Sequence, residues 1–307
     1  MNPPFQKTRL APTPSGYLHI GNVVSFLITS SLARNHGARI LLRIDDLDER
    51  RTRVKFIQDI FDTLEFLEIP YDEGPRTVAE HQQQFSQRHR MDQYEELLQH
   101  LKENDQAFGC DCSRKNLRQN HPKGWYTGNC LQRHLDLQGK NISWRLDTRT
   151  RGLRQLRTYP DSIKPCHLPQ SMNYFVVRKK DSDPAYQLTS VADDSYFGVD
   201  LVVRGEDLWD SSCAQIHLSA HLGGDPLSQV TFFHHPLVKD GEQKLSKSEG
   251  ALAIKTLREN GLSKEEVYLL AARQLGLKGP IHSLTAFQAS FMDKLKGNHF
   301  NHHNPEC

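Results

Sequence analysis

The chain has 307 residues, of which 39 are lysine or arginine and 37 are aspartate or glutamate. This length is enough for one large domain with attachments or for two domains. The near balance of charge argues against a protein that binds DNA mainly through bulk positive charge, although a local basic face still permits binding to phosphates. No apolar run approaches the roughly 20 residues that span a bilayer, and the N-terminus lacks the apolar core of a signal peptide. We therefore expect a cytoplasmic protein that does not contact a membrane.

The first hundred residues alternate between strand and helix patterns. Residues 6–11 predict a short strand that enters a Pro/Gly-rich turn, and the dense apolar run 39–45 has the length of a second strand. Between and after them, residues 22–36 and 52–69 predict helices, the latter from apolar residues at helical spacing. A long polar helix is expected over 79–104.

The middle of the chain, about residues 105–172, has a different character, with short strands, scattered Pro and Gly, and clustered cysteines. Strand and helix patterns then alternate again, and we expect elements at 173–180, 186–198, 199–205, 210–222 and 229–238. Beyond residue 250 the chain reads as helical, and Ser263 with Glu266 forms a capping box that opens a helix to about residue 275. Strand–helix units on both sides of an interruption predict an α/β protein with a doubly wound, Rossmann-like parallel sheet.

The first chemical motif is the segment 9–22, RLAPTPSGYLHIGN. Two prolines stiffen it, and Gly16 and Gly21 allow the backbone to approach a ligand closely. The segment leads directly into a helix, whose first N–H groups and dipole favour phosphate. There His19 can donate a hydrogen bond to a phosphate oxygen. Taken alone, the segment is equally well a Pro-rich turn with a helix-capping histidine.

The second motif is KLSKS at residues 244–248. Two lysines three residues apart, Lys244 and Lys247, can clamp a polyphosphate and neutralise a leaving pyrophosphate. Taken alone, such a pentapeptide is more often a solvated basic loop.

The third motif is a cysteine cluster formed by Cys110, Cys112 and Cys130. Three clustered thiols in a cytosolic protein suit a structural Zn²⁺, which needs four tetrahedral ligands. By chemistry alone His121 or His134 would be the usual fourth ligand. The alternative is three unrelated buried thiols.

Together the first two motifs resemble the HIGH and KMSKS signatures of class I aminoacyl-tRNA synthetases. Their flanks resemble the glutamyl branch: RILLRIDDLD at 39–48, Tyr186-Gln-Leu followed by Asp193-Asp194, and VRGEDL at 203–208. The resemblance covers about residues 7–255. Neither GxxxxGK[ST] nor GxGxxG occurs, so the competing nucleotide folds have no support.

Few residues follow Ser248, which leaves room for a small helical extension but not for an anticodon-binding domain. This length, and the sequence RGEDL at residues 204–208, resemble those of the glutamyl-Q tRNA(Asp) synthetases, a family of truncated paralogues. The resemblance implies activation of glutamate by ATP and Mg²⁺ to glutamyl-adenylate without tRNA, and then transfer of glutamate to the queuosine base of tRNA(Asp).

The resemblance also implies roles for particular residues. The catalytic residues are His19, Lys244 and Lys247. The ATP-binding residues are His19, Gly21, Asn22 and Lys247. The glutamate-binding residues are Arg9, Leu10, Ala11, Pro12, Thr13, Asp45, Tyr186 and Arg204. The ligands of a structural Zn²⁺ are Cys110, Cys112, Tyr126 and Cys130.

The implied organisation has four parts. Residues 1–104 and 173–250 form the two halves of the nucleotide-binding catalytic domain, and the second half carries the KLSKS loop. Residues 105–172 form an inserted acceptor-binding subdomain with the zinc site. Residues 251–307 form a helical extension and a tail, whose His- and Asn-rich end we expect to be frayed. The protein is expected to be a monomer.

Two positions depart from the family pattern. Asp45 stands where the family has Glu within Arg-Ile-Glu-Asp, which moves the carboxylate that would hold the ammonium group back by about one bond length. Asn22 stands where generic class I enzymes have a second histidine. Three alternatives remain: a minimal glutamyl-tRNA synthetase that charges the tRNA 3′ end, a non-catalytic tRNA-binding paralogue, and a nucleotidyltransferase that activates another small carboxylic acid.

Overall fold

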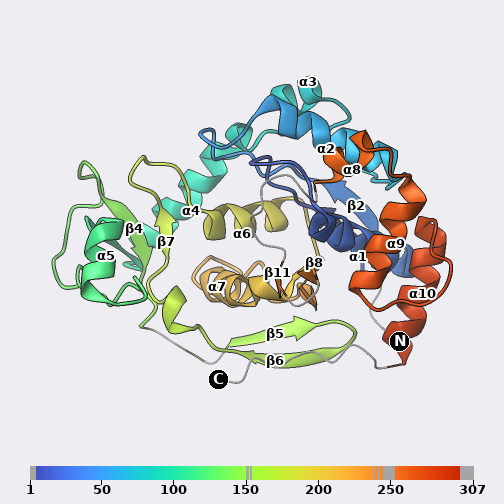
Figure 1. The fold of residues 1–307 in the computed structure, drawn as a ribbon. Coiled ribbons are helices and arrows are strands. Elements are labelled where there is room, and N and C mark those ends of the chain that lie inside the picture. Colours follow the sequence, from blue (N-terminus) through green and yellow to red (C-terminus); the bar gives the residue numbers. More distant parts are fainter. Residues whose placement is uncertain are drawn as a thin grey trace. The chain divides into compact units, whose positions relative to one another are not determined.

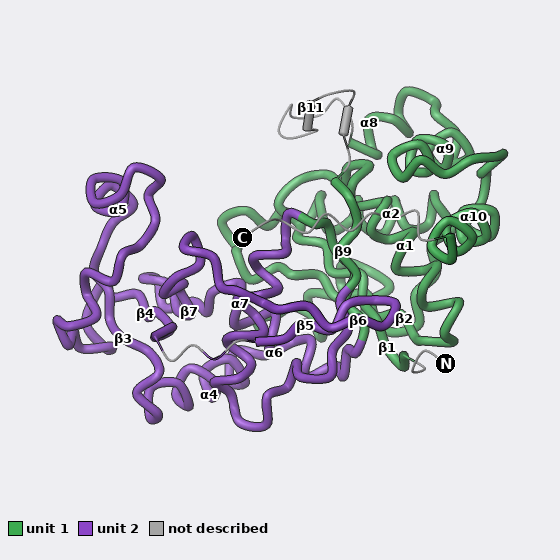
Figure 2. The backbone as a smooth tube through the Cα atoms, turned by 90° about the horizontal axis from the view of Figure 1, so that it is seen from below, with its two compact units in different colours: residues 1–89, 201–206, 233–307 green, residues 90–200, 207–232 purple. Residues whose placement is uncertain are grey.

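The computed structural model describes residues 5–149, 152, 154–237, 239–240, 243–244 and 253–297. The chain divides into two compact units, which Figure 2 shows in different colours. Unit 1 consists of Met1–His89, Leu201–Glu206 and Phe233–Cys307, and unit 2 consists of Arg90–Asp200 and Asp207–Phe232. Both units combine helices with strands, which confirms the predicted mixed α/β class.

Parallel strands form the sheet of unit 1. Strand β1 (Lys7–Leu10) pairs in parallel with β2 (Arg39–Leu42) along its whole length, and with β8 (Leu201–Gly205) where Thr8 faces Leu201. Strand β9 (Thr231–His235), whose last three residues belong to unit 1, is the next strand after β8. The predicted strands 6–11, 39–45, 199–205 and 229–238 are therefore confirmed, with shorter bounds.

Besides the three-residue helix α3 (Val78–Glu80), the described residues of unit 1 contain five α-helices, of which α1 packs against the strands of the sheet. They are α1 (Ile20–His36), α2 (Val54–Phe66), α8 (Ile254–Glu259), α9 (Lys264–Gln274) and α10 (Leu284–Lys296). Figure 1 shows α9 and α10, in orange and red, beside α1 in dark blue. Because α1 packs against both the sheet and these helices, it is apolar on several faces, and Val23, Leu27 and Leu32 are fully buried. The capping box at Ser263 is confirmed at the start of α9.

The prediction of one long helix over 79–104 is wrong. The segment contains a short helix α3 (Val78–Glu80), a π-helical turn η1 (His81–Phe85), a 3₁₀ turn η2 (Gln87–Arg90) and the helix α4 (Met91–Glu103). The cause is a distant carboxylate: Asp46 accepts a hydrogen bond from the Gln87 N–H at 2.9 Å, and its other oxygen lies 2.9 Å from Nε2 of His81. Ser86, between these two contacts, adopts an extended conformation with ψ 143°.

Unit 2 contains a separate antiparallel sheet. Strand β4 (Ser143–Leu146) lies between β3 (Ala107–Cys110) and β7 (Val176–Arg178). Strands β5 (Arg154–Thr158) and β6 (Ser162–Cys166) form a hairpin, and β5 also pairs in parallel with the first residues of β9. The longer helices of unit 2, besides α4, are α6 (Tyr186–Tyr196) and α7 (Trp209–Ser219).

The remaining elements are short. They are α5 (Arg114–Asn120), the 3₁₀ turns η3 (Gln170–Met172) and η4 (Glu206–Leu208), and the two-residue strands β10 (Lys239–Asp240) and β11 (Gln243–Lys244), which pair with each other. Among the helices in the described part of the chain, none has the length and apolarity needed to cross a membrane.

Candidate active site

His19 is the N-cap of α1, at the end of the loop that follows β1. Its Nδ1 accepts a hydrogen bond from the Gly21 N–H at 3.1 Å, and the Asn22 side chain accepts one from the His19 N–H at 3.0 Å. A neutral imidazole whose Nδ1 accepts carries its proton on Nε2. The ring is exposed, so the helix terminus offers backbone N–H groups together with a side-chain donor, a combination suited to phosphate. The capping role and the phosphate-binding role are therefore compatible.

Asn22 has a local explanation that the sequence analysis missed. It occupies the third position of α1 and closes a reciprocal cap with His19. The pair His19 and Asn22 differs from the usual Ser/Thr-x-x-Glu/Gln pattern of a capping box, so only the structure reveals this cap.

Arg9 and Arg204 are buried on one face of the parallel sheet. The register of Thr8 with Leu201, together with the alternation of side chains along a strand, directs both arginines to the same face. They are 5% and 4% exposed. Nη1 of Arg9 donates to the Val203 carbonyl at 3.3 Å, whereas Nε and Nη2 of Arg204 are buried atoms that make no hydrogen bond within the described residues. A planar guanidinium fork is the natural partner of a carboxylate.

The carboxylate of Asp45 lies against an arginine that the sequence analysis did not select. Nε of Arg43 donates to Oδ1 of Asp45 at 2.7 Å, and Nη2 donates to Oδ2 at 3.1 Å. An ionised carboxylate has about four acceptor positions, so this fork leaves acceptor capacity for an ammonium group while it fixes the carboxylate in place. The spacing i, i+2 directly after a strand was the available signal, because such side chains lie on one face.

The backbone brings the predicted loop residues next to Asp45. The Asp45 N–H donates to the Pro12 carbonyl at 3.0 Å, and the Arg43 N–H donates to the Leu10 carbonyl at 2.9 Å. Residues 9–12, Asp45 and Arg204 therefore gather at the carboxyl ends of neighbouring parallel strands, where open α/β sheets bind ligands. Thr13 lies in the same loop and is exposed.

For three predicted residues the structure gives no side-chain placement relative to this group. Tyr186 is the first residue of α6 in unit 2, and its side chain is 46% exposed. Lys244 belongs to β11, of which only the backbone is described, and Lys247 lies outside the described residues. Their roles remain predictions.

A buried ion pair fixes the helix that begins at Tyr186. Asp193 of α6 accepts hydrogen bonds from Nε of Arg90 at 2.8 Å and from the Tyr94 hydroxyl at 2.7 Å, and its side chain is fully buried. Burial, reinforced by the Asp193 charge, raises the pKa of Tyr94 far above its usual range, so the phenol remains a donor. One of the two aspartates in the 186–198 segment is thus explained by packing.

The three cysteines of the third motif form a cluster in unit 2. The Sγ atoms of Cys110, Cys112 and Cys130 all lie within 4.8 Å of one another, and those of Cys112 and Cys130 are 3.5 Å apart. The Tyr126 hydroxyl interacts with the same residue, since it accepts from the Cys130 N–H at 2.8 Å. The three thiols are grouped closely enough to hold one metal ion, and the Tyr126 hydroxyl is bonded to one of the same residues. His121 is instead stacked on Trp125, with ring centroids 5.1 Å apart.

The surroundings shift the pKa values of Cys110 and Cys112 in opposite directions. Burial would raise the pKa of Cys110, but the charge of Arg145 and hydrogen bonds to the thiolate outweigh it and lower that pKa below its ordinary value. Burial and the neighbouring thiols raise the pKa of Cys112 to about 12. Cys110 therefore loses its proton more readily than Cys112 does.

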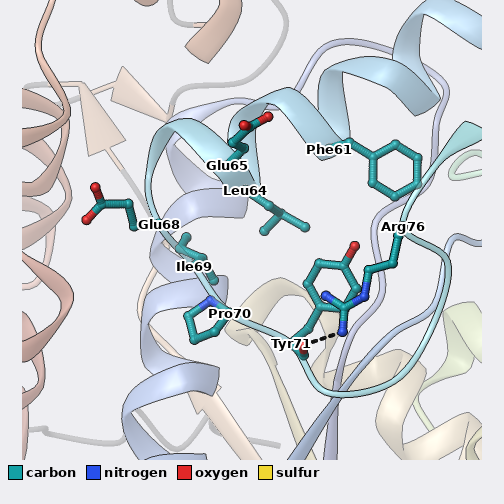
Figure 3. Close-up of a pocket in the computed structure, with 8 residues that line it drawn as sticks. All are labelled: Phe61, Leu64, Glu65, Glu68, Ile69, Pro70, Tyr71 and Arg76. Carbon is teal, nitrogen blue, oxygen red and sulfur yellow. Dashed lines mark hydrogen bonds between the residues drawn. The ribbon is translucent and has the colours of Figure 1, made fainter.

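A separate cavity of about 410 Å³ lies at the end of α2. Figure 3 shows the guanidinium of Arg76 over the Tyr71 ring, 3.9 Å from its centroid, beside Phe61 and Leu64. None of the predicted site residues lines this cavity, so it is not part of the candidate active site.

Comparison with known proteins places these features in a family. The family model described as "tRNA synthetases class I (E and Q), catalytic domain" matches residues 6–284. The glutamyl-Q tRNA(Asp) synthetase of Synechococcus sp. (strain CC9605) is 35% identical over 282 residues, which are 91% of this chain and 86% of that protein. The enzyme of the same name from Burkholderia cenocepacia is 33% identical over 309 residues, 95% of this chain and 96% of that protein.

Longer relatives match as well. Glutamate–tRNA ligase 1 of Nitrosococcus oceani is 31% identical over 271 residues, 84% of this chain and 54% of that protein. The chain thus spans about half the length of the glutamate–tRNA ligases that it matches. The crystal structure of glutamate–tRNA synthetase from Elizabethkingia anophelis superposes with a TM-score of 0.73 at 21% identity, over 92% of this chain and 65% of that one. At this identity the likeness shows the fold.

Proposed function

The chain belongs to the family of class I tRNA synthetase catalytic domains of the E and Q branch, and from this premise we propose that it activates glutamate with ATP and transfers the glutamate to a tRNA. The observation that carries the proposal is the pair of buried arginines, Arg9 and Arg204, on one face of the sheet. They lie at the carboxyl ends of parallel strands, next to a helix N-terminus that is suited to phosphate.

The proposed acceptor is the queuosine base of tRNA(Asp). Relatives named glutamyl-Q tRNA(Asp) synthetase are 35% and 33% identical to this chain, whereas relatives named glutamate–tRNA ligase are 31% and 30% identical. The higher identities, together with the RGEDL sequence at residues 204–208, support transfer to the modified base over charging of the tRNA 3′ end.

In the proposed first step, an α-carboxylate oxygen of glutamate attacks the α-phosphorus of ATP, and the bond to pyrophosphate breaks. The Nε2–H of His19 and the first N–H groups of α1 donate hydrogen bonds to phosphate oxygens. The Mg²⁺ that accompanies ATP would neutralise part of the negative charge of these oxygens. Lys244 and Lys247 are proposed to neutralise the pyrophosphate. In the second step, a hydroxyl of the acceptor attacks the activated carbonyl and AMP leaves.

Glutamate presents two carboxylates and one ammonium group. We assign the carboxylates to Arg9 and Arg204, and the ammonium to Asp45, which Arg43 holds in position. Tyr186 is assigned a hydroxyl contact. The shorter carboxylate of Asp45 is held in a fixed position by the two hydrogen bonds from Arg43.

The cysteine cluster is proposed to bind a structural Zn²⁺ through Cys110, Cys112, Tyr126 and Cys130. A bound Zn²⁺ would cross-link the segments that carry these ligands and would supply no reacting group. Residues 105–172 are proposed as the subdomain, inserted into a doubly wound sheet, that contacts the acceptor RNA.

Two measurements test the function. Glutamate-dependent exchange of pyrophosphate into ATP should occur without RNA, and an excess of another small carboxylic acid should not compete. Labelled glutamate should then appear on queuosine-containing tRNA(Asp) and not on the same tRNA without queuosine. Label at a 3′ end would establish a minimal glutamyl-tRNA synthetase instead, and an absence of exchange would point to a non-catalytic paralogue.

The glutamate pocket is tested by Arg204→Lys. Because lysine is a point charge without the planar fork, we expect the KM for glutamate to rise by about tenfold or more, with the KM for ATP nearly unchanged. Exchange kinetics at varied glutamate and varied ATP measure the two constants. Equal effects on both would contradict the assignment.

A further inference from the structure

The backbone of Leu18, directly before His19, is bound on both sides within unit 1. Its N–H donates to Oδ2 of Asp59 on α2 at 3.1 Å. Its carbonyl accepts from the N–H of Ile254, the first residue of α8, at 2.8 Å, and His19 forms an antiparallel bridge with Ala253. The loop that caps α1 is therefore joined to α2 through one side chain and to the start of α8 through its backbone.

Asp59 also forms an ion pair with a residue of α8. Nη2 of Arg258 lies 3.6 Å from Oδ1 of Asp59 and 3.6 Å from Oδ2 of Asp62, which is close to Asp59 on α2. The Asp59 side chain is 2% exposed and that of Asp62 is 40% exposed. Because water screens the Asp62 contact much more strongly, the carboxylate of Asp59 is the main electrostatic link between these two helices and the loop.

The preceding loop residue contacts the same two helices. The ring of Tyr17 packs edge-on against Phe56 of α2, with centroids 5.0 Å apart. Nζ of Lys55 on α2 lies 5.7 Å from the Tyr17 centroid, and Nζ of Lys255 on α8 lies 4.9 Å from it. Two consecutive residues of the loop are thus held between α2 and α8.

Stability alone does not account for a carboxylate at this position. Oδ1 of Asp59 is buried and makes no hydrogen bond within the described residues. Burial raises the pKa of Asp59 even though the Leu18 N–H and the Arg258 charge oppose the rise. Burying an ion costs several kcal/mol, and apolar replacements of buried ion pairs are often neutral or stabilising. What the carboxylate supplies here is a defined position for the groups that it contacts.

We propose that Asp59 is a positioning residue that holds the His19 loop and α8 in one arrangement. Asp59 thus gives the loop that carries His19 and the helix α8 a common anchor. It acts through Leu18 and Arg258, and its own carboxylate is buried away from the substrates. The inference rests on the proposed function in that the affected step is the use of ATP.

The first arm of the test measures the link itself, in the full chain and without substrates. Asp59→Ala removes both contacts, whereas the matched control Asp62→Ala removes a contact to Arg258 and leaves Leu18 bound. We expect amide hydrogen exchange at Leu18 and Ile254 to accelerate by about tenfold or more in Asp59→Ala, and by less than about twofold in Asp62→Ala.

A second variant covers the case in which Asp59→Ala does not fold. Asp59→Asn keeps an acceptor oxygen for the Leu18 N–H but loses the charge that attracts Arg258. We expect the Leu18 amide to remain protected while amides of 255–259 exchange faster.

The second arm measures pyrophosphate exchange. Asp59→Ala should raise the KM for ATP by about tenfold while the KM for glutamate stays within about twofold, because Arg9 and Arg204 lie on the strands and not on the loop. A mere loss of folded protein would lower kcat and leave both KM values unchanged. Asp62→Ala should keep both constants at wild-type values.

The outcomes separate the two proposals. Equal amide exchange in Asp59→Ala and Asp62→Ala overturns the inference, and so does an unchanged KM for ATP in a variant whose amides are accelerated. If the wild-type protein shows no glutamate-dependent exchange, the proposed function fails, and the amide measurement still decides whether Asp59 links the loop to α8.

Discussion

His19 combines a structural and a proposed chemical task in one ring. Its Nδ1 caps α1 through the Gly21 N–H, and this contact places the proton of the neutral ring on Nε2. Asn22 completes the cap, which explains why an amide serves where other class I sequences have a second histidine. The two departures from the signature are thus different in kind: Asn22 is a capping residue, and Asp45 is a carboxylate fixed by Arg43.

The two tasks of His19 can be separated by substitution. Asparagine is a good N-cap and alanine is a poor one. We expect His19→Ala to lower the free energy of unfolding by about 1 kcal/mol, and His19→Asn to lower it by clearly less. Both variants should lose pyrophosphate exchange by about 100-fold. Urea denaturation and exchange kinetics measure the two effects, and full activity in His19→Asn would remove the imidazole from the mechanism.

At the scale of elements, the break between η1 and α4 shows how one carboxylate overrides local preference. The segment 79–104 has a composition compatible with a continuous helix, but Asp46 captures the Gln87 N–H and contacts His81. Burial would raise the pKa of Asp46, but hydrogen bonds from His81, Ser86 and Gln87 outweigh it and hold the pKa below its ordinary value.

This contact predicts a pH dependence of stability. Because the folded-state pKa of Asp46 lies below the unfolded value, its contribution is fully present above the ordinary aspartate pKa and is lost as pH falls through the folded value. The difference in unfolding free energy between wild type and Asp46→Asn should therefore shrink below about pH 4. Urea denaturation across pH measures it. The exposed Asp161→Asn is the control, and a constant difference at all pH values would contradict the assignment.

The cysteine cluster predicts a metal content. We expect about one zinc per chain, its loss in Cys112→Ser, and weaker retention against a chelator in Tyr126→Phe, which keeps three thiolates. Cys213→Ala, whose thiol is outside the cluster, should retain the metal. Atomic absorption of the purified proteins gives the stoichiometry. A metal-free wild type purified with zinc present would leave the cluster as three packed thiols.

At the scale of the whole molecule, the near balance of charge predicts that no strong self-repulsion or bulk basic surface dominates its behaviour. We expect a monomer of 35.3 kDa in solution. Light scattering coupled to size-exclusion chromatography at increasing protein concentration measures the mass. A mass that doubles with concentration would contradict this expectation.

Much of the architecture was readable from the sequence because it depends on local chemistry. Apolar spacing predicted α2, and the capping box at Ser263 predicted the start of α9, since both effects act over a few residues. The co-linear motifs around His19 and at residues 244–248 indicated the family. The close spacing of Cys110 and Cys112 in the sequence indicated that the thiols lie together, and the structure confirms the cluster.

Tertiary structure decided the features that depend on residues distant in the chain. The contact of Arg9 with the Val203 carbonyl depends on the pairing of β1 with β8, and the break after η1 depends on Asp46 reaching Gln87. No sequence pattern around Asp59 predicts its contact with the Leu18 N–H. A buried carboxylate needs donors, and these come from whichever segments the fold brings near. The sequence by itself therefore determined the family and the residues for which a chemical role is proposed, and only the folded chain determined which side chains hold those residues in place.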